Sequence, residues 1–405
     1  MNWVLTVVFL ISFAFVHDAN AQNWNNSGAK LGKNSRIPEG SSPTLEQMRL
    51  AFNNYFKSDS FRPRIMISAS DIPLPVQFDV QNDDYLEKQM NNTGLLSYIL
   101  VENGVVVRDM ISPNDRMGDL VTNETVLNSQ SVGKSFVSYL MGHAICDGYI
   151  SGIDQKISDW SLFSDTFYQD ISIKDLINMN VGDSKYADRS RIKFKNPDRK
   201  KNVNNRPMAY WSSSLKGTKR SKSSFGSQFN YNGFLSNLAH NYIRYKSGNE
   251  YQNLLKRVYQ EKIRIGHGVS FIKVDNASTA HGESDLKSGT MRSTMFATRY
   301  DYLRIAMAML DDWQTDTCVG KYLKEIYANK VRRQTKGKSP FSSAAGYAGF
   351  FHTDFNGVKG TVFGMNGYGG QNVFINFDTG TIVVAHAVHQ DYNWRKLVFD
   401  AVSTN

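Results

Sequence analysis

The chain has 405 residues, of which 41% are hydrophobic, 12% aromatic and 21% charged. These values are close to globular averages and exclude a collagen-like, low-complexity or wholly disordered polypeptide, while the length allows one or two domains. Lysine and arginine total 47 against 37 acidic residues, a net charge of +10, so nucleic acid and membranes have to be considered as partners.

The amino-terminal residues have the pattern of an export signal. An apolar run over residues 4–16 is followed by Ala-Asn-Ala at 19–21, the small-x-small pattern that signal peptidases accept. The run is too short for an ordinary membrane span, and no second run of about 20 apolar residues follows. We expect a signal peptide over residues 1–21, cleaved after Ala21, a periplasmic or extracellular protein, and no stable membrane span after cleavage. Because no Lys or Arg precedes the run, an uncleaved anchor is the alternative.

The segment after the export signal differs in composition from the rest of the chain. Residues 22–45 are rich in Asn, Ser, Gly and Lys, which is typical of a flexible lead-in. The ordered part is expected to begin near Thr44. We therefore expect one domain over residues 46–405.

Two antiparallel strand pairs are predicted, one near each end of this domain. In residues 95–111, two apolar runs flank Asn103-Gly104, a dipeptide that favours a tight hairpin turn. In residues 372–388, two further apolar runs flank the turn at 378–380. Since the apolar spacing between the two pairs is largely helical, we expect an α+β fold in which both termini complete one antiparallel sheet, with helices flanking the sheet and a helical subdomain.

Three helices are predicted between the strand pairs. The first begins close to Ser131, where apolar residues recur at three- and four-residue spacing, and ends at Gly148. Residues 172–179 and 293–310 show the same spacing and give two further helices.

Most of the excess positive charge lies in residues 189–222, which contain twelve basic residues and one acid, Asp198. A surface that binds DNA would spread its basic residues over a fold or along a helix, with aromatic residues for stacking, so no nucleic-acid partner is expected. We interpret residues 189–222 as a solvated insertion loop. Contact with an anionic substrate or a cell-surface polymer is the alternative.

The two cysteines, Cys146 and Cys318, are 172 positions apart. In an oxidising compartment they can form one disulfide bond, but Cys146 lies in an apolar helical stretch where a buried free thiol fits equally well. No Cys-x-x-Cys pair or zinc-type spacing occurs, so neither a metal nor another cofactor is expected.

Ser131 and Lys134 carry the first candidate chemistry. They are three residues apart and therefore share one face of the predicted helix. A serine hydroxyl is a poor nucleophile unless a base adjoins it, and a lysine surrounded by apolar residues can lose its proton and act as that base. Backbone N–H groups at a helix start can also stabilise negative charge on a substrate oxygen. Alone, this spacing is a weak signal, and an N-cap serine with a surface lysine is the alternative.

Extended stretches around these residues resemble the superfamily of serine β-lactamases, penicillin-binding proteins and esterases, in particular the branch with 6-aminohexanoate-dimer hydrolases. SQSVGKSFVSYLMGHAICDGYISGIDQKISDW resembles the family helix that carries the nucleophile, and ISIKDLINMNVGDSKY resembles the segment that follows. The similarity covers roughly residues 95–390. It implies a β-lactamase/transpeptidase-like fold with Ser131 as the acylated nucleophile and Lys134 beside it.

The second family motif is a tyrosine, usually in Tyr-x-Asn, and FNYNGFLSNL resembles it at Tyr231. The family role implies that the Tyr231 phenol acts as a base during acylation and as an acid for the leaving group. Gly233 stands where the family often has Asn, and Asn232, one residue earlier, is expected to contact the substrate. This difference argues against β-lactam recognition, whereas branch members that cut linear amides or esters tolerate it.

The third family motif resembles the glycine-rich stretch at residues 363–377. The Tyr368 N–H is expected to complete an oxyanion hole with that of Ser131. No Lys or His occupies the family's cationic position, so a substrate carboxylate lacks its usual partner. Three glycines are expected to let a substrate lie against the backbone: Gly367, Gly369 and Gly370.

The histidines give weaker signals. His386 and His389 have an odd spacing that puts them on opposite faces of a predicted strand, so they do not predict a metal site. His143 is interpreted as a packed or surface residue of the first helix, and His281 as a loop residue. A Ser-His-Asp triad on a nucleophile elbow is excluded because Gly-x-Ser-x-Gly is absent.

Taken together, the motifs predict a secreted serine hydrolase that forms an acyl-enzyme on Ser131 and cleaves amide or ester bonds of a small linear substrate. Two alternatives stay open. One is a β-lactamase or D-alanyl-D-alanine peptidase. The other is a non-catalytic cell-wall-binding protein with the same fold, which would contact an anionic polymer through residues 189–222. Substrate specificity in this fold lies in variable loops.

Overall fold

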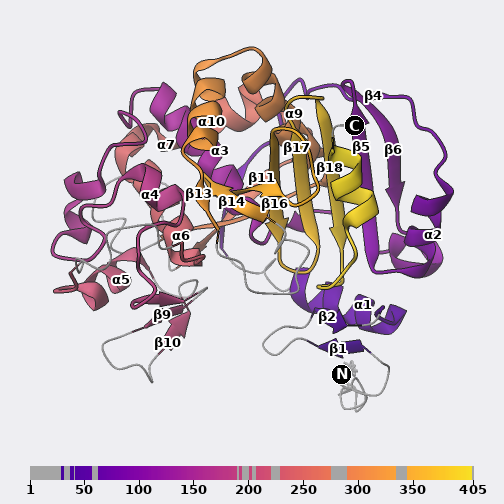
Figure 1. The fold of residues 1–405 in the computed structure, drawn as a ribbon, viewed down its shortest axis with the longest axis horizontal. Coiled ribbons are helices and arrows are strands. Elements are labelled where there is room, and N and C mark those ends of the chain that lie inside the picture. Colours follow the sequence, from indigo (N-terminus) through magenta and orange to yellow (C-terminus); the bar gives the residue numbers. More distant parts are fainter. Residues whose placement is uncertain are drawn as a thin grey trace, which may run out of the picture.

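The computed structural model describes most of the chain (Figure 1). The predicted signal peptide, parts of the predicted basic loop and His281 lie outside the described residues. The described residues are 29–31, 37–40, 42–56, 63–188, 191–193, 200–202, 207–219, 229–274, 290–333 and 344–403.

The larger of the two main sheets contains the two predicted strand pairs and confirms the α+β fold. β18 pairs antiparallel with β5, so the pair from the amino-terminal half and the pair from the carboxy-terminal end join edge to edge. β4 is the exception, because it pairs parallel with β6. In spatial order the nine described strands are β13 (Val331–Arg332), β14 (Ala344–Ala348), β15 (Phe351–Phe355), β16 (Val362–Gly367), β17 (Gln371–Asn376), β18 (Thr381–Ala387), β5 (Leu95–Glu102), β6 (Val105–Ile111) and β4 (Gln77–Phe78).

The turn between β5 and β6 is the one that its dipeptide predicts. Asn103 and Gly104 have φ angles of 52° and 80°, and two consecutive residues with positive φ match the twist of the flanking strands. Side chains along β18 then alternate between the two faces of the sheet. Ile382 and Val384 belong to the main hydrophobic core, whereas Val383 belongs to a second core on the opposite face.

A second sheet of four described strands was not predicted from the sequence. It contains, in order, β3 (Arg64–Ile67), β11 (Val269–Val274), β12 (Thr290–Ala297) and β7 (Leu127–Asn128). The predicted helix over residues 293–310 is therefore wrong in its first part, because residues 293–297 belong to β12. The helix starts after Thr298, whose side chain accepts a hydrogen bond from the Asp301 N–H and caps it.

The helices lie on the faces of the sheets and in a separate helical part, which Figure 1 shows beside the large sheet. Within the described residues, no helix combines the length and hydrophobicity needed to cross a membrane. The helices are α1 (Leu45–Ala51), α2 (Asp84–Asn92), α3 (Val132–Cys146), α4 (Ile173–Ile177), α5 (Met208–Leu215), α6 (Gly233–Ser247), α7 (Tyr251–Lys256), α9 (Arg299–Gln314), α10 (Cys318–Ala328) and α11 (Asp400–Val402).

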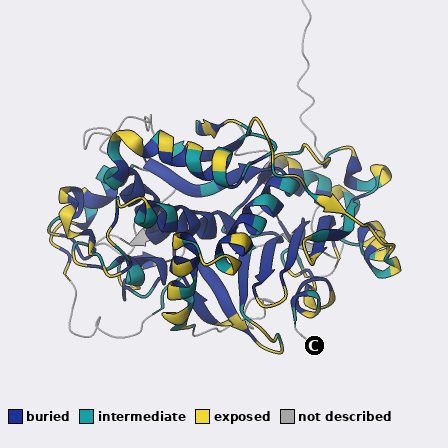
Figure 2. Ribbon diagram, turned by 90° about the horizontal axis from the view of Figure 1, so that it is seen from above, coloured by how far each residue is buried: buried dark blue, intermediate teal, exposed yellow. Residues whose placement is uncertain are grey.

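Helix α3 is the predicted nucleophile helix, and nearly all of its residues are buried. It begins after Ser131 and is followed by Gly148, whose φ angle of 80° suits the residue that ends a helix. Figure 2 shows that buried positions follow the central strands and helices, while exposed positions gather on outer turns. A helix enclosed in this way holds its first turn in a fixed position.

Part of the segment predicted as a flexible lead-in is docked on the domain. β1 (Ala29–Leu31) and β2 (Pro38–Gly40) pair antiparallel, and Ile37 is fully buried in the main core. The Gln390 N–H donates a hydrogen bond to Pro38 O. Thr44 then caps α1 with its side chain.

The predicted basic insertion is more structured than a solvated loop. β9 (Arg191–Lys193) and β10 (Lys200–Asn202) pair antiparallel, and α5 follows within the same segment. Met208, Trp211 and Leu215 lie on one face of α5 and are buried in the main core. The charged residues on both sides of α5 conceal this apolar spacing in the sequence.

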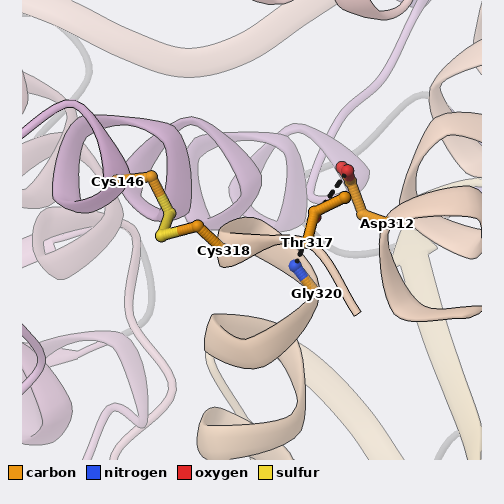
Figure 3. The surroundings of a disulfide bond; sticks show 5 residues. All are labelled: Cys146, Asp312, Thr317, Cys318 and Gly320. Carbon is orange, nitrogen blue, oxygen red and sulfur yellow. Dashed lines mark hydrogen bonds between the residues drawn. A yellow bond between two sulfur atoms is a disulfide. The ribbon is translucent and has the colours of Figure 1, made fainter. Parts of the chain in front are cut away.

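A disulfide bond joins Cys146 to Cys318 and resolves the open question about these residues (Figure 3). It connects the carboxy-terminal end of α3 to the first residue of α10. Beside it, the Thr317 hydroxyl donates a hydrogen bond to Asp312 and accepts one from the Gly320 N–H. The α3 helix is therefore fixed covalently at the end opposite Ser131.

Loss of this disulfide should destabilise the protein, because it closes a long loop in the unfolded chain. We expect the Cys146→Ser/Cys318→Ser variant to lose about 2–5 kcal/mol of unfolding free energy, measured by urea denaturation. Dithiothreitol should produce the same loss in the wild type and none in the variant. An unchanged denaturation midpoint of the wild type under reducing conditions would contradict the disulfide.

Candidate active site

Ser131 and Lys134 are in direct contact at the start of α3. Lys134 Nζ donates a hydrogen bond to Ser131 Oγ at 2.6 Å, and the lysine side chain is buried, with 8% of the residue exposed. Ser131 occupies the N-cap position, yet its hydroxyl makes no capping hydrogen bond. The alternative of an N-cap serine with a surface lysine is therefore wrong, and the hydroxyl is available to Lys134.

The turn that leads into Ser131 is held in an unusual backbone conformation. Gln130 has a φ angle of 49°, which is uncommon for a residue other than glycine, and its N–H donates to Asn128 Oδ1 at 2.8 Å. Ser129 is anchored to β12 by two hydrogen bonds with the Met295 backbone, each 2.8 Å long. Strain of this kind persists only where neighbouring contacts enforce it, and it is concentrated at functional sites.

Tyr231 joins this pair from the segment that precedes α6. Its ring centroid lies 5.2 Å from Lys134 Nζ, and the residue is half-buried. The fold thus brings together three predicted site residues, although Tyr231 is about 100 positions from the other two. The Lys134 ammonium thus lies over the face of the Tyr231 ring, within cation–π range.

Asn232 does not point into this site, contrary to the prediction that it contacts the substrate. Its side chain is fully buried, where Nδ2 donates to Asp183 at 3.0 Å and Oδ1 accepts from the Leu235 N–H at 3.1 Å. The residue therefore caps α6 and leaves no exposed polar atom for a ligand. Gly233 is the first residue of α6.

The third predicted motif lies directly against the turn that carries the nucleophile. A side chain at Gly367 would start 2.6 Å from Ser129 O and 3.0 Å from Gln130 Cβ, so only glycine allows this approach. Gly367 ends β16, and the half-buried Tyr368 follows in the turn to β17. The predicted oxyanion donors, the backbone N–H groups of Ser131 and Tyr368, therefore lie on neighbouring segments.

Gly369 and Gly370 have structural roles that account for them without a substrate. Both are buried in the turn between β16 and β17, with φ angles of 89° and 108°. A side chain at Gly369 would meet Ile37, and one at Gly370 would meet Ala387. The prediction that both glycines line a substrate surface is therefore not supported, whereas Gly367 lies beside the nucleophile.

Sequence reasoning missed a cluster of polar and aromatic residues that surrounds Tyr231. His352 stacks on Tyr231 with ring centroids 6.3 Å apart, and Tyr347 contacts both rings edge-on. Arg333 Nη1 lies 2.9 Å from His352 Nδ1. Since a guanidinium only donates, Nδ1 accepts and the neutral imidazole carries its proton on Nε2.

The electrostatic environment keeps His352 neutral. Burial lowers its pKa well below the usual value, and the positive charges of Arg333 and Lys134 lower it further. Burial also lowers the pKa of Arg333, while Tyr347 and Tyr231 act in the opposite direction. His352 is therefore neutral at neutral pH and accepts the hydrogen bond from Arg333 through Nδ1.

This cluster reaches the site through a hairpin, β14–β15, that is docked on two helices. Gly349 and Phe350 form its turn with φ angles of 53° and 67°. The Phe350 N–H donates to Ile177 O in α4, and the Ser135 hydroxyl in α3 donates to Phe350 O. The sequence signal that would have predicted this hairpin is a glycine between two short strand-like segments, AAGYA before Gly349 and FHTDF after Phe350.

Three other histidines make structural contacts. His386 is buried, with Nδ1 3.0 Å from Ser97 Oγ, and His389 Nε2 lies 3.2 Å from Gly40 O. His143 packs edge-on against Tyr139 inside the protein. In the part of the chain that the structure describes, no cluster of His, Cys, Asp and Glu side chains fits a metal ion.

Comparison with known proteins identifies the fold. A family model described as Beta-lactamase matches residues 82–396. A proposed 6-aminohexanoate-dimer hydrolase from Bacillus anthracis is similar over 92% of this chain and 98% of its own, with a TM-score of 0.59 and 14% identity. A penicillin-binding protein homologue from Caulobacter crescentus is similar over 76% and 90%, with a TM-score of 0.52 and 13% identity.

A third similar structure is FmtA from Staphylococcus aureus, which matches over 82% of this chain and 94% of its own, with a TM-score of 0.51 and 16% identity. At such identities the structural likeness concerns the fold alone. None of the curated proteins compared with the chain matches its sequence.

The protonation of His352 is directly measurable. We expect nitrogen-15 spectra of the imidazole to report a neutral ring protonated on Nε2 at pH 7 and still neutral at pH 5.5, with the signal assigned by His352→Gln. The pKa of His352 is lower in the folded protein than in the unfolded chain, where it is about 6.5. The free energy of unfolding should therefore decrease as the pH falls below about 6.5, because only the unfolded chain then takes up the proton. Arg333→Met should raise the pKa of His352, and an unchanged titration in that variant would contradict the described contact.

Proposed function

The chain belongs to the β-lactamase family. On that premise we propose that it is a serine hydrolase that forms an acyl-enzyme on Ser131. Its substrate is a small linear compound with an amide or ester bond. The observation that carries the proposal is the 2.6 Å contact between Ser131 Oγ and the buried Lys134, with the Tyr231 ring beside it. A non-catalytic binding protein does not need a lysine buried against a serine that does not cap its helix, whereas a β-lactamase or peptidase would use the same pair, so the choice between the hydrolases rests on the substrate features below.

In the acylation step, Ser131 Oγ attacks the substrate carbonyl carbon. Its proton passes to Lys134 Nζ in the neutral form, or to the Tyr231 oxygen in the phenolate form, and the bond to the leaving group breaks as that group takes up the same proton. Water then attacks the acyl-enzyme, and the same groups return the proton to Ser131. The phenol of Tyr231 beside Lys134 gives the relay two members, so the serine proton can pass from one to the other before it reaches the leaving group.

The developing oxyanion needs donors aimed at its position. We assign this role to the backbone N–H groups of Ser131, at the positive end of the α3 dipole, and of Tyr368. The close approach of Gly367 to Ser129 supports this assignment, because it brings the β16–β17 turn beside the nucleophile. Such donors need no rearrangement during the reaction, which is the source of their catalytic effect.

Two features favour a linear substrate over a β-lactam. Gly233, in place of the usual asparagine, is the first residue of α6, and the neighbouring Asn232 is buried as its cap. The similar protein from Bacillus anthracis is a proposed hydrolase of 6-aminohexanoate dimer, a linear amide. We propose hydrolysis of a compound of this kind, with an unstrained amide or ester.

We also propose that the protein is exported and works in the periplasm or outside the cell. The apolar run and the Ala-Asn-Ala site at residues 19–21 support export. The disulfide between Cys146 and Cys318 adds support, because such bonds persist in oxidising compartments.

A fluorophosphonate probe tests the nucleophile directly. We expect it to label the wild type, with labelling abolished in Ser131→Ala and slowed at least about 10²-fold in Lys134→Met and Tyr231→Phe, since each removes a proton-transfer group. Ser138→Ala is the matched control, because Ser138 is a buried serine of the same helix that bonds to Tyr322. Labelling that persists in Ser131→Ala would refute the assignment of the nucleophile.

Hydrolysis assays separate the proposed activity from its alternatives. We expect turnover of p-nitrophenyl acetate and of linear amide dimers, and little turnover of the β-lactam nitrocefin. Rapid nitrocefin hydrolysis would instead favour a β-lactamase. A wild type that neither reacts with the probe nor hydrolyses any of these compounds would favour a binding protein.

A further inference from the structure

A fully buried carboxylate, Asp183, lies directly behind the Tyr231 segment. It accepts hydrogen bonds from the residues on both sides of Tyr231: Asn230 Nδ2 lies 2.6 Å from Oδ1, and Asn232 Nδ2 lies 3.0 Å from Oδ2. The Tyr168 hydroxyl donates to Oδ2 at 2.9 Å. One carboxylate thus holds both flanks of the proposed proton-transfer residue.

The segment that carries Asp183 is itself fixed. The N–H groups of Tyr186 and Ala187 donate to Asp183 O at 2.7 and 2.8 Å. A few residues earlier, Met179 O accepts the Asn230 N–H at 2.8 Å. The chain after α4 and the chain before α6 are therefore joined by backbone and side-chain hydrogen bonds, and Tyr231 lies within the joined stretch.

The charge state of Asp183 determines how the asparagines are oriented. An ionised carboxylate only accepts, so both asparagines must present their NH₂ groups to it. Asn232 Oδ1 is thereby left to accept the Leu235 N–H and cap α6. A neutral amide at position 183 would donate as well as accept, which would allow the asparagine side chains to turn over and the cap to be lost.

A buried carboxylate surrounded by neutral donors is costly to the fold. Burial raises the pKa of Asp183 to about 6, although the hydrogen bonds from Asn230, Tyr168 and Asn232 act in the opposite direction. An apolar side chain at this position would avoid that cost. The stretch that this costly group fixes is the one that carries Tyr231.

We propose that Asp183 is a positioning residue for catalysis, whose ionised carboxylate fixes Asn230 and Asn232 and thereby holds the Tyr231 phenol against Lys134 and Ser131. This inference rests on the proposed role of Tyr231 in proton transfer. It assigns Asp183 no contact with the substrate. Its effect should therefore appear in the chemical step and only through Tyr231.

The test is a double-mutant cycle on p-nitrophenyl acetate hydrolysis by the full-length protein. We expect Asp183→Asn to reduce kcat by up to about 10²-fold, because a displacement of the catalytic group by about 1 Å has an effect of this size. KM should change less than about 3-fold. In the Tyr231→Phe background the same substitution should have no further effect, because the positioned group is gone. The proposal would be overturned if the fold-losses of kcat from the two substitutions multiply in the double variant. An unchanged kcat in Asp183→Asn would also overturn it.

Asp312→Asn is the matched control for loss of a buried carboxylate. Asp312 is also buried and accepts hydrogen bonds from a tyrosine, Tyr139, and from Thr317, but it lies near the far end of α3, by the disulfide (Figure 3). We expect Asp312→Asn to leave kcat and KM unchanged in the folded fraction. An equal loss of kcat in this control would show a general effect of destabilisation and overturn the proposal.

Two further measurements keep the inference separate from folding and from the proposed function. If Asp183→Asn does not fold, Asn230→Ala removes one flank alone and should give a smaller loss of kcat that is again absent in Tyr231→Phe. If Asn230→Ala reduces kcat equally in the wild type and in Tyr231→Phe, the positioning role fails. If Ser131→Ala retains the wild-type rate, the proposed function fails. If Ser131→Ala is inactive while Asp183→Asn is fully active, only the role of Asp183 fails.

Discussion

The contact between Lys134 Nζ and Ser131 Oγ is the interaction on which the chemistry of this structure depends. A lysine with 8% of its surface exposed has few partners, and its hydrogen bond to the serine hydroxyl satisfies one of its donors. The contact requires a helix whose first turn cannot move. That requirement explains why α3 is enclosed by other elements, why its preceding turn is anchored to β12, and why its far end is held by a disulfide.

The site is assembled from segments that are far apart in the sequence and that meet because the two sheets and the helical part share one core. Tyr231 arrives from the start of α6, Gly367 from the end of β16, and His352 from the β14–β15 hairpin. The segments that carry them are also held by contacts outside the site, as the Asn230 N–H to Met179 O and Phe350 N–H to Ile177 O hydrogen bonds show. Asp183 illustrates this arrangement, since it never reaches Ser131 and yet binds both neighbours of Tyr231.

Local signals predicted the parts of the fold that local interactions determine. Asn103-Gly104 specified its hairpin because few dipeptides accept two positive φ angles, and the apolar spacing after Ser131 specified α3. The pairing of β18 with β5 followed from the position of the two hairpins at the ends of the domain. The family motifs supplied Ser131, Lys134 and Tyr231, and the fold brings these three together.

Features that depend on tertiary contacts were missed or misassigned. Residues 293–297 have apolar spacing compatible with a helix, and only pairing with β11 makes them a strand. Asn232 looked like a ligand-binding amide, but its burial against Asp183 makes it a helix cap. Arg333 lies outside every recognised motif, and its relation to His352 arises only when β13 and β15 both flank β14.

The most direct test of this account is to identify the covalent intermediate. Rapid acid quenching during p-nitrophenyl acetate turnover, followed by peptide mapping with mass spectrometry, should place one acetyl group on the peptide that contains Ser131, and none in Ser131→Ala. An acetyl group on another residue, or turnover without any acylated peptide, would contradict the account.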